Sequence, residues 1–359
     1  MERRQFIKKV GVGMVAGTGL AAASRPAHAR AEFRWKMVTS WPKNFPGLGT
    51  GANFLGNLIE EMSNGRISVK VYGAGELVPA MQVFDAVSKG TAQMGHSASY
   101  YWKGKHEAAQ FFASVPFGMT CREMMGWLYH GGGLDLWTEL YERFNLIPAA
   151  SGNTGVQMAG WFNKKIDSPE DLKGLKMRIP GLGGEVMTRA GATSVLLPGS
   201  ELFTALQSGT IDATEWVGPF NDLAFGFQNV AKYYYYPGWH EPGSALECMI
   251  NKTAFEALPD DLQSIVTNAC RVATQDMMAE YTTRDKEALL EIEAKPDLEI
   301  LKLPDSVLAL LKKLSEEVVE EIADKDPFSR KVYDSYRSYQ EKATHWHDLA
   351  ERSYILARS

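Results

Sequence analysis

The chain has 359 residues, of which 45% are hydrophobic and 23% charged, and its formal net charge is −5. This composition is typical of a globular protein long enough to form two domains with separate cores. The negative charge excludes the electrostatic attraction on which nucleic-acid binding depends, and nothing beyond the N-terminus has the uncharged apolar length of a membrane span.

The N-terminal segment has the pattern of an export signal. A charged start with Arg3-Arg4-Gln5-Phe6 is followed by a weakly apolar run, Val10 to Ala23, and by Ala27-His28-Ala29, the small-x-small pattern that a signal peptidase accepts. The paired arginines resemble a twin-arginine signal. We therefore expect a signal peptide over residues 1–31, cleaved after Ala29 or Ala31, and export to the periplasm by the twin-arginine route. An uncleaved anchor helix is the alternative.

Two βα units follow along the chain. In each unit, strands with alternating hydrophobicity are separated by helical periodicity, which is typical of a parallel sheet. The first unit predicts strands over 33–39, 66–72 and 92–96, with helices over 51–63 and 80–88. The second predicts strands over 156–162, 175–179 and 194–197, with helices starting at 168–171 and over 185–190 and 201–208.

The two units contain an internal echo, in which a proline-started helix ends at a glycine and a threonine before an extended segment. Chance, or convergence of βα turns, is the alternative explanation. If the echo is real, residues 97–102 and 214–220 lie at equivalent carboxyl ends of strands and face one shared cleft, where open α/β sheets bind ligands. The matched residues are Pro79, Phe84, Ala86, Gly90 and Thr91 against Pro198, Phe203, Ala205, Gly209 and Thr210.

The C-terminal third is predicted to be mainly helical. Helical periodicity runs over 254–287 and 305–323, with an extended segment at 298–302 between them. Pro327 ends the helical continuity, and a final helix is predicted over 328–356. Before these helices, Tyr233 to Tyr236 predict a strand whose alternate rings are buried.

Several of these segments together resemble the tripartite ATP-independent periplasmic (TRAP) transporter solute-binding proteins of the DctP type. The resemblance covers the whole mature chain and is carried by Gly73-Ala74-Gly75-Glu76-Leu77, Val87-Ser88-Lys89-Gly90, Leu172 to Pro180, and Ala205 to Gly209 leading to Asp212 to Trp216. Gln157, Glu215-Trp216 and Trp239-His240-Glu241 resemble the branch that binds 2-oxo or 2-hydroxy monocarboxylates through a bound cation.

The resemblance implies an α/β fold in which two domains form a clamshell, with hinge strands, a long bracing helix and C-terminal helices. The chain would cross between the domains several times. The expected division is 32–155 in domain I, 156–242 in domain II, 243–283 back in domain I and 284–327 back in domain II. Residues 328–359 would form a C-terminal helix that protomers exchange to make a homodimer. The implied partners are a small carboxylate ligand and the subunits of a TRAP membrane permease.

Arg178 is the leading candidate for the ligand's carboxylate. It lies at the end of the predicted strand 175–179, and a planar guanidinium offers paired donors that match a carboxylate. Most arginines are surface or structural residues, so the strand position alone does not select Arg178. The match to the carboxylate-binding arginine of the resembled family does.

Glu215 and Glu241 are the candidate cation ligands. Each lies beside a tryptophan in a locally apolar stretch, where an unpaired charge is costly and a hard cation would neutralise both. A general acid/base pair or a solvated surface are the alternatives. The resemblance adds the side-chain oxygen of Gln157 and the backbone carbonyl of Trp216. Two glutamates and a ligand carboxylate, set against Arg178, favour Ca²⁺ over Na⁺, but the sequence leaves both ions open.

The remaining candidate ligand contacts are aromatic or polar neighbours of these groups. Tyr100 and Tyr101 should contribute from the first domain, while Phe220 and Asn221 lie just beyond Trp216 and are expected to wall the pocket. Packing of the domain interface is the alternative role for each ring. Aromatic walls around one ion-paired end suit pyruvate, 2-oxobutyrate or lactate.

Two other classes of function remain possible from the sequence. An exported lyase or hydrolase would use the cation as a Lewis acid, with His240 as the only candidate base beside Glu241. A ligand sensor for a signalling receptor would need the same clamshell. We expect no catalysis, because no serine or cysteine nucleophile motif accompanies His240.

Overall fold

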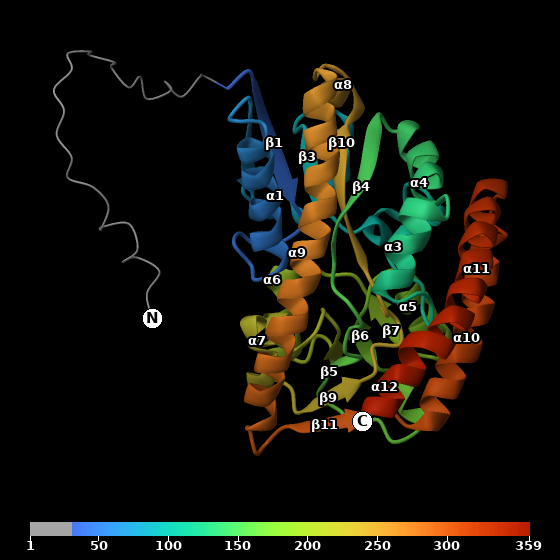
Figure 1. The fold of residues 1–359 in the computed structure, drawn as a ribbon. Coiled ribbons are helices and arrows are strands. Elements are labelled where there is room, and N and C mark those ends of the chain that lie inside the picture. Colours follow the sequence, from blue (N-terminus) through green and yellow to red (C-terminus); the bar gives the residue numbers. More distant parts are fainter. Residues whose placement is uncertain (1–30) are drawn as a thin grey trace, which may run out of the picture.

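The computed structural model describes residues 31–359, which fold into two lobes, each built on its own β-sheet (Figure 1). The predicted signal peptide, apart from its last residue, lies outside the described residues. Within residues 31–359, no helix combines the length and the apolar character needed to cross a membrane.

The first lobe contains a five-stranded sheet in the order β2-β1-β3-β10-β4. β1, β2 and β3 are parallel, and β10 runs antiparallel to both β3 and β4. The strands are β1 (Phe33–Thr39), β2 (Ile67–Tyr72), β3 (Met94–Ser97), β4 (Leu146–Asn153) and β10 (Ala245–Asn251). The helices are α1 (Leu48–Met62), α2 (Val83–Ser88), α3 (Cys121–His130), α4 (Gly133–Glu142) and α8 (Lys252–Glu256), with the 3₁₀ segments η1 (Ala80–Gln82), η2 (Ser99–Trp102) and η3 (Glu107–Phe112).

The second lobe contains a six-stranded mixed sheet in the order β11-β9-β5-β8-β6-β7. Its strands are β5 (Gly160–Phe162), β6 (Lys176–Arg178), β7 (Thr193–Val195), β8 (Ala213–Thr214), β9 (Tyr233–Tyr236) and β11 (Glu299–Lys302). Its helices are α5 (Gly181–Arg189), α6 (Gly199–Gln207), α7 (Pro219–Phe225) and α10 (Asp305–Ala323), with 3₁₀ turns η4 (Pro169–Leu172) and η5 (Phe227–Asn229). The strand predicted from 156 begins only at Gly160, because the backbone of Gln157 and Met158 bonds to Glu241 and Val217 instead.

A 34-residue helix, α9 (Asp260–Glu293), runs along both lobes and is the predicted brace (Figure 1). It contacts β4 and α1 of the first lobe and α7 of the second. The sequence predicted one helix over 254–287, but the structure has α8 and α9 separated at Pro259. Proline cannot continue a helix without losing a backbone hydrogen bond, and it starts one readily.

The internal echo corresponds to two equivalent helix–turn–strand units. α2 is followed by Gly90 at φ +75°, and α6 by Gly209 at φ +72°. After each glycine the chain closes the same backbone bond, from Ala92 to Ala86 and from Ile211 to Ala205, before it enters β3 or β8. Glycine adopts this left-handed conformation without steric cost, so the two turns share a physical cause.

The tyrosine strand β9 differs from the prediction in its burial. Tyr234 and Tyr235 are both fully buried, while Tyr236 is exposed. The strand lies inside the sheet, between β11 and β5, and both of its faces are covered, so neighbouring rings rather than alternate rings are buried.

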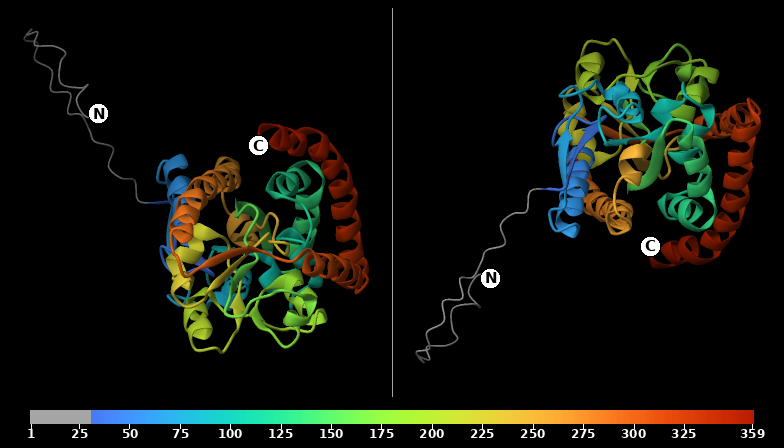
Figure 2. Two further views of the ribbon diagram at one scale, coloured as in Figure 1. Left: turned by 90° about the horizontal axis from the view of Figure 1, so that it is seen from below. Right: turned by 90° about the horizontal axis from the view of Figure 1, so that it is seen from above.

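The C-terminal helix, α11 (Pro327–His347), continues through a π-turn (Asp348–Arg352) into α12 (Ser353–Arg358) and wraps around the outside of the molecule (Figure 2). Val332 and Tyr336 of its first half are buried, and the Tyr336 hydroxyl accepts a hydrogen bond from the backbone of Met119 at 2.8 Å. Beyond this anchor Tyr339 is still half-buried against the core, whereas Trp346, Leu349, Tyr354, Ile355 and Leu356 are exposed.

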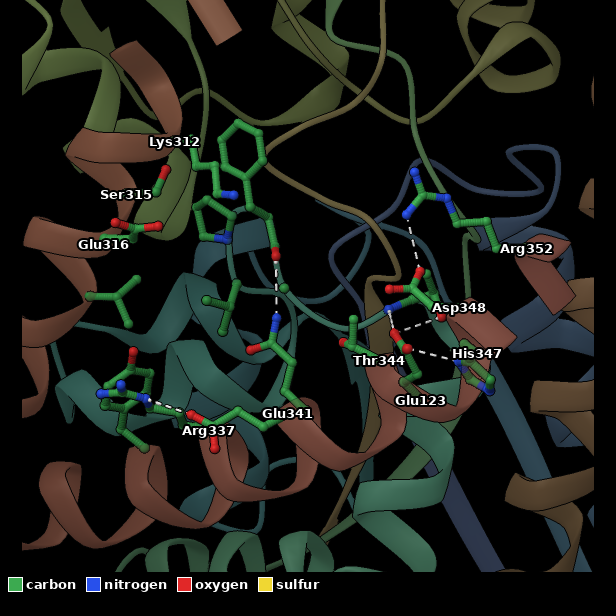
Figure 3. A pocket seen from close by; sticks show the side chains of 18 of the residues that line it. Glu123, Lys312, Ser315, Glu316, Arg337, Glu341, Thr344, His347, Asp348 and Arg352 are labelled. Carbon is green, nitrogen blue, oxygen red and sulfur yellow. Dashed lines mark hydrogen bonds and ion pairs between the residues drawn. The ribbon is translucent and has the colours of Figure 1, made fainter. Parts of the chain in front are cut away.

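A groove of about 1020 Å³ lies between α10, the loop before α3, and the C-terminal helices (Figure 3). His347 bonds to Glu123 at one side of the groove, at 2.7 Å, and Arg337 bonds to Glu341 at another. His347, at the end of α11, thus connects the C-terminal helix to α3.

Candidate functional site

Arg178 ends β6 and reaches from the second lobe to the first. It is 1% exposed, and its Nη1 donates to the Glu215 carboxylate and to the Glu215 carbonyl. Nε donates to the Leu197 carbonyl at 3.2 Å, and Nη2 to the Tyr101 hydroxyl at 3.3 Å. The guanidinium is therefore held in one orientation by both lobes, with its donors directed at groups that line the space between them.

The charge of Arg178 is maintained despite its burial. Burial acts to lower the pKa of this guanidinium, but the opposite charge of Glu215 and the neighbouring phenols outweigh it, and the pKa is raised overall. The guanidinium also lies over the Trp216 ring, 5.0 Å from its centroid, which is a favourable cation–π arrangement. The Arg178 guanidinium thus carries a permanent positive charge in a position almost closed to water.

A cluster of three potential metal ligands lies beside Arg178. Glu215, His240 and Glu241 are all buried, and each offers a ligand atom within 4.8 Å of the others. The His240 Nε2 lies 3.3 Å from a Glu215 oxygen. Burial, and after it the negative charge of Glu215, raise the pKa of Glu241 to about 7. Two carboxylates so close together in a buried site favour a cation between them.

Gln157 completes this donor set. Its Nε2 donates to Glu241 at 2.8 Å and to the Thr154 hydroxyl at 3.0 Å, and Ser244 donates to the same Glu241 carboxylate. Within residues 31–359, the buried Gln157 Oε1 finds no hydrogen-bond partner. An unpartnered carbonyl oxygen next to two carboxylates is a donor set that fits Na⁺ or Ca²⁺.

The backbone explains why residues so far apart in the sequence meet here. The Gln157 amide donates to the Glu241 carbonyl, and the Gly238 amide donates to the Gln157 carbonyl. The Glu215 amide donates to the Arg178 carbonyl as the chain leaves β8. The first two bonds join the crossing segments 154–159 and 237–244 to each other, and the third joins the carboxyl ends of β6 and β8, the edge where α/β sheets place ligands.

Tyr100 and Tyr101 belong to η2 and bring the first lobe to the site. Their rings pack edge to face with centroids 4.8 Å apart. Burial raises the pKa of both phenols, so both stay neutral. Tyr101 contacts the arginine directly, whereas Tyr100 packs behind it at the close approach of Gly181, the first residue of α5.

Phe220 and Asn221 lie on α7. Asn221 donates to the Pro46 carbonyl of the first lobe at 3.0 Å and accepts from the Tyr281 hydroxyl at 2.8 Å. The Phe220 ring packs on Tyr281, and its backbone amide donates to Asp285. Their contacts join α7 to α9 and to the first lobe, and their role as walls of the pocket stays a prediction.

Some residues of the site were not found from the sequence. Thr154 and Ser244 support Gln157 and Glu241, and Trp41 packs on both Tyr101 and Trp216. Trp41 lies two residues beyond the end of β1, and the rule that ligands bind beyond the carboxyl ends of strands could have indicated it. The two hydroxyl residues carry no comparable signal, because their role depends on the crossing segments.

Comparison with known proteins agrees with this architecture. The sequence model of bacterial extracellular solute-binding proteins, family 7 (DctP), matches residues 37–326. A monocarboxylate 2-oxoacid-binding periplasmic protein of Nostoc sp. is 40% identical over 359 residues, covering 99% of this chain and 98% of the relative.

Solved structures of TRAP periplasmic solute-binding proteins are similar over most of the chain. One from Colwellia psychrerythraea, with bound calcium and pyruvate, has a TM-score of 0.88 and 42% identity, covering 90% of this chain and 98% of that one. One from Pseudoalteromonas atlantica has bound sodium and pyruvate, with the same TM-score, identity and coverage.

A third structure, from Bordetella bronchiseptica, is a mixed-occupancy dimer with calcium and picolinate in the occupied site. It has a TM-score of 0.89 and 36% identity, and covers 92% of this chain and 98% of that one. The family model and these relatives span nearly all of the described residues. The chain therefore belongs to family 7 of the bacterial extracellular solute-binding proteins, the DctP family of TRAP transporter solute-binding proteins.

Proposed function

We propose that this protein binds a small 2-oxo monocarboxylate together with one Ca²⁺ or Na⁺ between its lobes and delivers it to a TRAP membrane permease. Pyruvate is the first candidate ligand, with 2-oxobutyrate and lactate as further candidates. The observation that carries the proposal is the position of Arg178. This buried, positively charged side chain contacts both lobes and lies beside the cluster of Glu215, His240 and Glu241. The Nostoc relative and the pyruvate-bound structures support this ligand class.

The pairing of Arg178 with Glu215 indicates how the site accepts an anion. Glu215 now accepts from the guanidinium through one carboxylate oxygen and its backbone carbonyl, and a ligand carboxylate would offer the guanidinium a pair of acceptor oxygens in place of that carboxylate oxygen. When the ligand takes this place, the Glu215 oxygens are released toward Glu241 and Gln157. Tyr101 stays within reach of the arginine and orients the ligand from the first lobe. A cation at the cluster then offsets the charge of the released carboxylate.

The charge balance favours a divalent ion. Glu215, Glu241 and the ligand carboxylate carry three negative charges against the one positive charge of Arg178, and Ca²⁺ neutralises the remainder, whereas Na⁺ leaves a net negative site. Glu215, Glu241, the Oε1 of Gln157 and the carbonyl of Trp216 are the proposed cation ligands. Arg178, Tyr101, Tyr100, Gln157 and Trp216 are the proposed ligand contacts, and Phe220 and Asn221 act at the rim.

Calorimetry tests the proposal. Protein stripped of ions with a chelator is titrated with pyruvate in Na⁺-free buffer, and again after addition of Ca²⁺ or Na⁺ alone. We expect measurable binding only with a cation present and a larger affinity gain with Ca²⁺. Equal pyruvate affinity in all three buffers would remove the cation from the proposal. Absence of binding to any 2-oxo acid in every buffer would refute the ligand class.

An enzyme alternative is testable with the same preparation. His240, the base that it requires, is engaged with Glu215 in the cluster. We expect pyruvate to be recovered unchanged from the complex by NMR, and formation of a product at catalytic rates would overturn this expectation. A sensor role shares the same clamshell, and uptake by a reconstituted permease distinguishes transport from signalling.

We further propose that the mature protein is periplasmic, exported by the twin-arginine route, and that its domains have the boundaries expected from the sequence. The two sheets draw their strands from the segments assigned to each domain. Replacing Arg3 and Arg4 with lysine should block export if the twin-arginine route is used. Unchanged export of the variant would favour the general secretory route.

Homodimerisation through residues 328–359 is proposed on the exposure of the distal apolar side chains. Trp346 is 64% exposed, and the groove beside α10 lies against this segment (Figure 3). Ending the chain after Thr344 retains Val332 and Tyr336, which belong to the core. We expect the full chain to be a dimer and the truncated chain a monomer by light scattering. Identical masses per particle would refute the exchange.

A further inference from the structure

Trp41 connects the aromatic residues of the two lobes. Its side chain is 2% exposed, and its ring centroid lies 6.3 Å from that of Tyr101 and 6.2 Å from that of Trp216. Tyr101 bonds to the Arg178 guanidinium, and Trp216 packs under it. Trp41 is therefore the ring, among the aromatic contacts of residues 31–359, that touches both aromatic neighbours of the arginine. Trp41 thus belongs to the same group of rings as the two aromatic residues that contact the guanidinium.

A hydrogen bond fixes the orientation of this indole. The Trp41 Nε1 donates to the Nδ1 of His96 at 2.8 Å, and the Nε2 of His96 lies 3.1 Å from the Ser151 carbonyl. Burial lowers the pKa of His96 to about 4, so the ring is neutral at physiological pH. Because Nδ1 accepts from the tryptophan, the proton is on Nε2 and is donated to Ser151. Both ring nitrogens are thus satisfied in a fully buried place.

Ser151 can accept this bond because of an irregularity in β4. Leu246 of β10 pairs with Gly152, whereas Glu247 pairs with Ala150, so Ser151 is skipped in the ladder. A β-bulge of this kind frees a backbone group that must find another partner. His96 supplies it. The strand that leads out of the first lobe is thereby connected, through two side-chain bonds, to the ring that packs against Tyr101 and Trp216.

We propose that Trp41 is a specificity-determining residue that limits the length of the ligand's tail, and that His96 is the positioning residue that holds its indole in place. This inference rests on the proposed function. Moving the indole to admit a longer tail would leave the Trp41 N–H and the His96 Nδ1 unsatisfied in the core, which is costly. The pocket therefore accepts a methyl group beyond the keto carbon and disfavours a propyl group.

The test measures the ratio of affinities for pyruvate and 2-oxopentanoate by calorimetry at saturating Ca²⁺. Trp41→Phe removes the second ring and the N–H, and we expect the ratio to move toward 2-oxopentanoate by roughly 10-fold or more, as for a few methylenes in an apolar pocket. Trp35→Phe is the matched control, because Trp35 is a buried tryptophan of β1 in the separate core that includes residues of α1 and α9. It should leave the ratio unchanged.

Two substitutions at His96 distinguish a role in orienting the Trp41 indole from a role only in stabilising the fold. Asparagine places an acceptor near the Nδ1 position and retains the bond to Trp41, whereas glutamine places a donor near the Nε2 position and retains the bond to Ser151. We expect His96→Gln to shift the ratio in the same direction as Trp41→Phe, by about 3- to 10-fold. His96→Asn should keep the wild-type ratio within about 3-fold.

The outcomes are distinct. If Trp41→Phe folds and its ratio equals that of the wild type, or if both ligands weaken in parallel, the inference is wrong. If Trp41→Phe does not fold, His96→Gln and His96→Asn provide the test. Equal ratios of pyruvate to 2-oxopentanoate affinity in these two variants would overturn the inference. If the wild-type protein binds neither acid, the proposed function is wrong. This outcome differs from failure of the inference, in which the wild-type protein binds pyruvate but the ratio of affinities does not change in the variants.

Discussion

The two lobes present different chemistry to the space between them. The second lobe and the crossing segments contribute charged groups, with Arg178 against Glu215 and Glu241. The first lobe contributes the rings of Trp41, Tyr100 and Tyr101, and its neighbouring buried titratable groups are pushed toward their neutral forms. Burial lowers the pKa of His96 to about 4, and it raises the pKa of Glu247 to about 7.

This difference suggests a division of tasks. Charge-assisted bonds from one lobe set the strength of binding and its dependence on a cation, while a rigid aromatic wall on the other lobe sets selectivity. Each charged group is costly to bury alone, so placing the charges together lets them compensate one another. The neutral wall can then close over the ligand without adding a charge that must be paired. Four experiments test this contrast.

Removal of the arginine should have the largest effect. Arg178→Met deletes the charge that meets the ligand and leaves Glu215 buried without its partner. We expect pyruvate affinity to fall by roughly 100-fold or more, because truncation of one member of a buried charge pair costs about 2–5 kcal/mol. Calorimetry measures the affinity, and circular dichroism checks the fold. Arg189→Met, at a partly exposed arginine of α5 that pairs with Glu321, is the control and should bind normally. Pyruvate binding of wild-type strength by Arg178→Met would contradict the assignment.

Neutralising one carboxylate of the cluster should be next in size. Glu241→Gln retains an acceptor for Ser244 but removes a charge from the site. We expect Ca²⁺ affinity to fall by roughly 10- to 100-fold, and pyruvate affinity to respond much less to added Ca²⁺. Calcium titration followed by calorimetry measures both. Glu247→Gln, a buried glutamate of the first lobe, serves as the matched control. If both variants respond to Ca²⁺ as the wild type does, the cluster is not the cation site.

The first lobe should show its neutral character in the dependence of stability on pH. Glu247 accepts bonds from Trp102 and Tyr141, and burial raises its pKa from 4.5 to about 7. The folded protein then holds a proton that the unfolded chain releases, so this group lowers stability as pH rises from about 5 to 8, by at most about 3 kcal/mol. Glu247→Gln should flatten the fall in Tm over this range, measured by calorimetry. Glu256→Gln, at an exposed position, should not, and parallel profiles for wild type and Glu247→Gln would refute the assignment.

The contact across the rim should contribute least. Asn221→Ala removes the bond to the Pro46 carbonyl of the first lobe and the acceptor for Tyr281. We expect pyruvate affinity to fall by about 5-fold, because a neutral hydrogen bond contributes roughly 1 kcal/mol. Asn229→Ala, at an exposed residue of the same lobe, is the control. A loss as large as that of Arg178→Met would place Asn221 in the ligand shell, as the sequence predicted, rather than at the rim.

Much of the fold was predictable because it depends on local patterns. The strands at 33–39 and 233–236 and the helix at 305–323 were predicted at the bounds that the structure has. Alternation, helical periodicity and the glycine turns at Gly90 and Gly209 are properties of short segments, and they act in the same way in any context. The family resemblance added the arginine and the glutamates, because it is carried by short motifs that include them.

The sequence alone thus predicted the order of the elements in the two βα units and in the C-terminal third, the family, and the charged residues of the site. Only the tertiary structure decided that the strand predicted from 156 starts at Gly160, that Asn221 bonds across the rim, and that Trp41 is held by His96 against a bulge in β4. These features depend on backbone and side-chain groups that find partners 40 or more residues away. A local pattern records what a segment prefers, whereas a buried polar group takes whichever partner the packed fold brings to it.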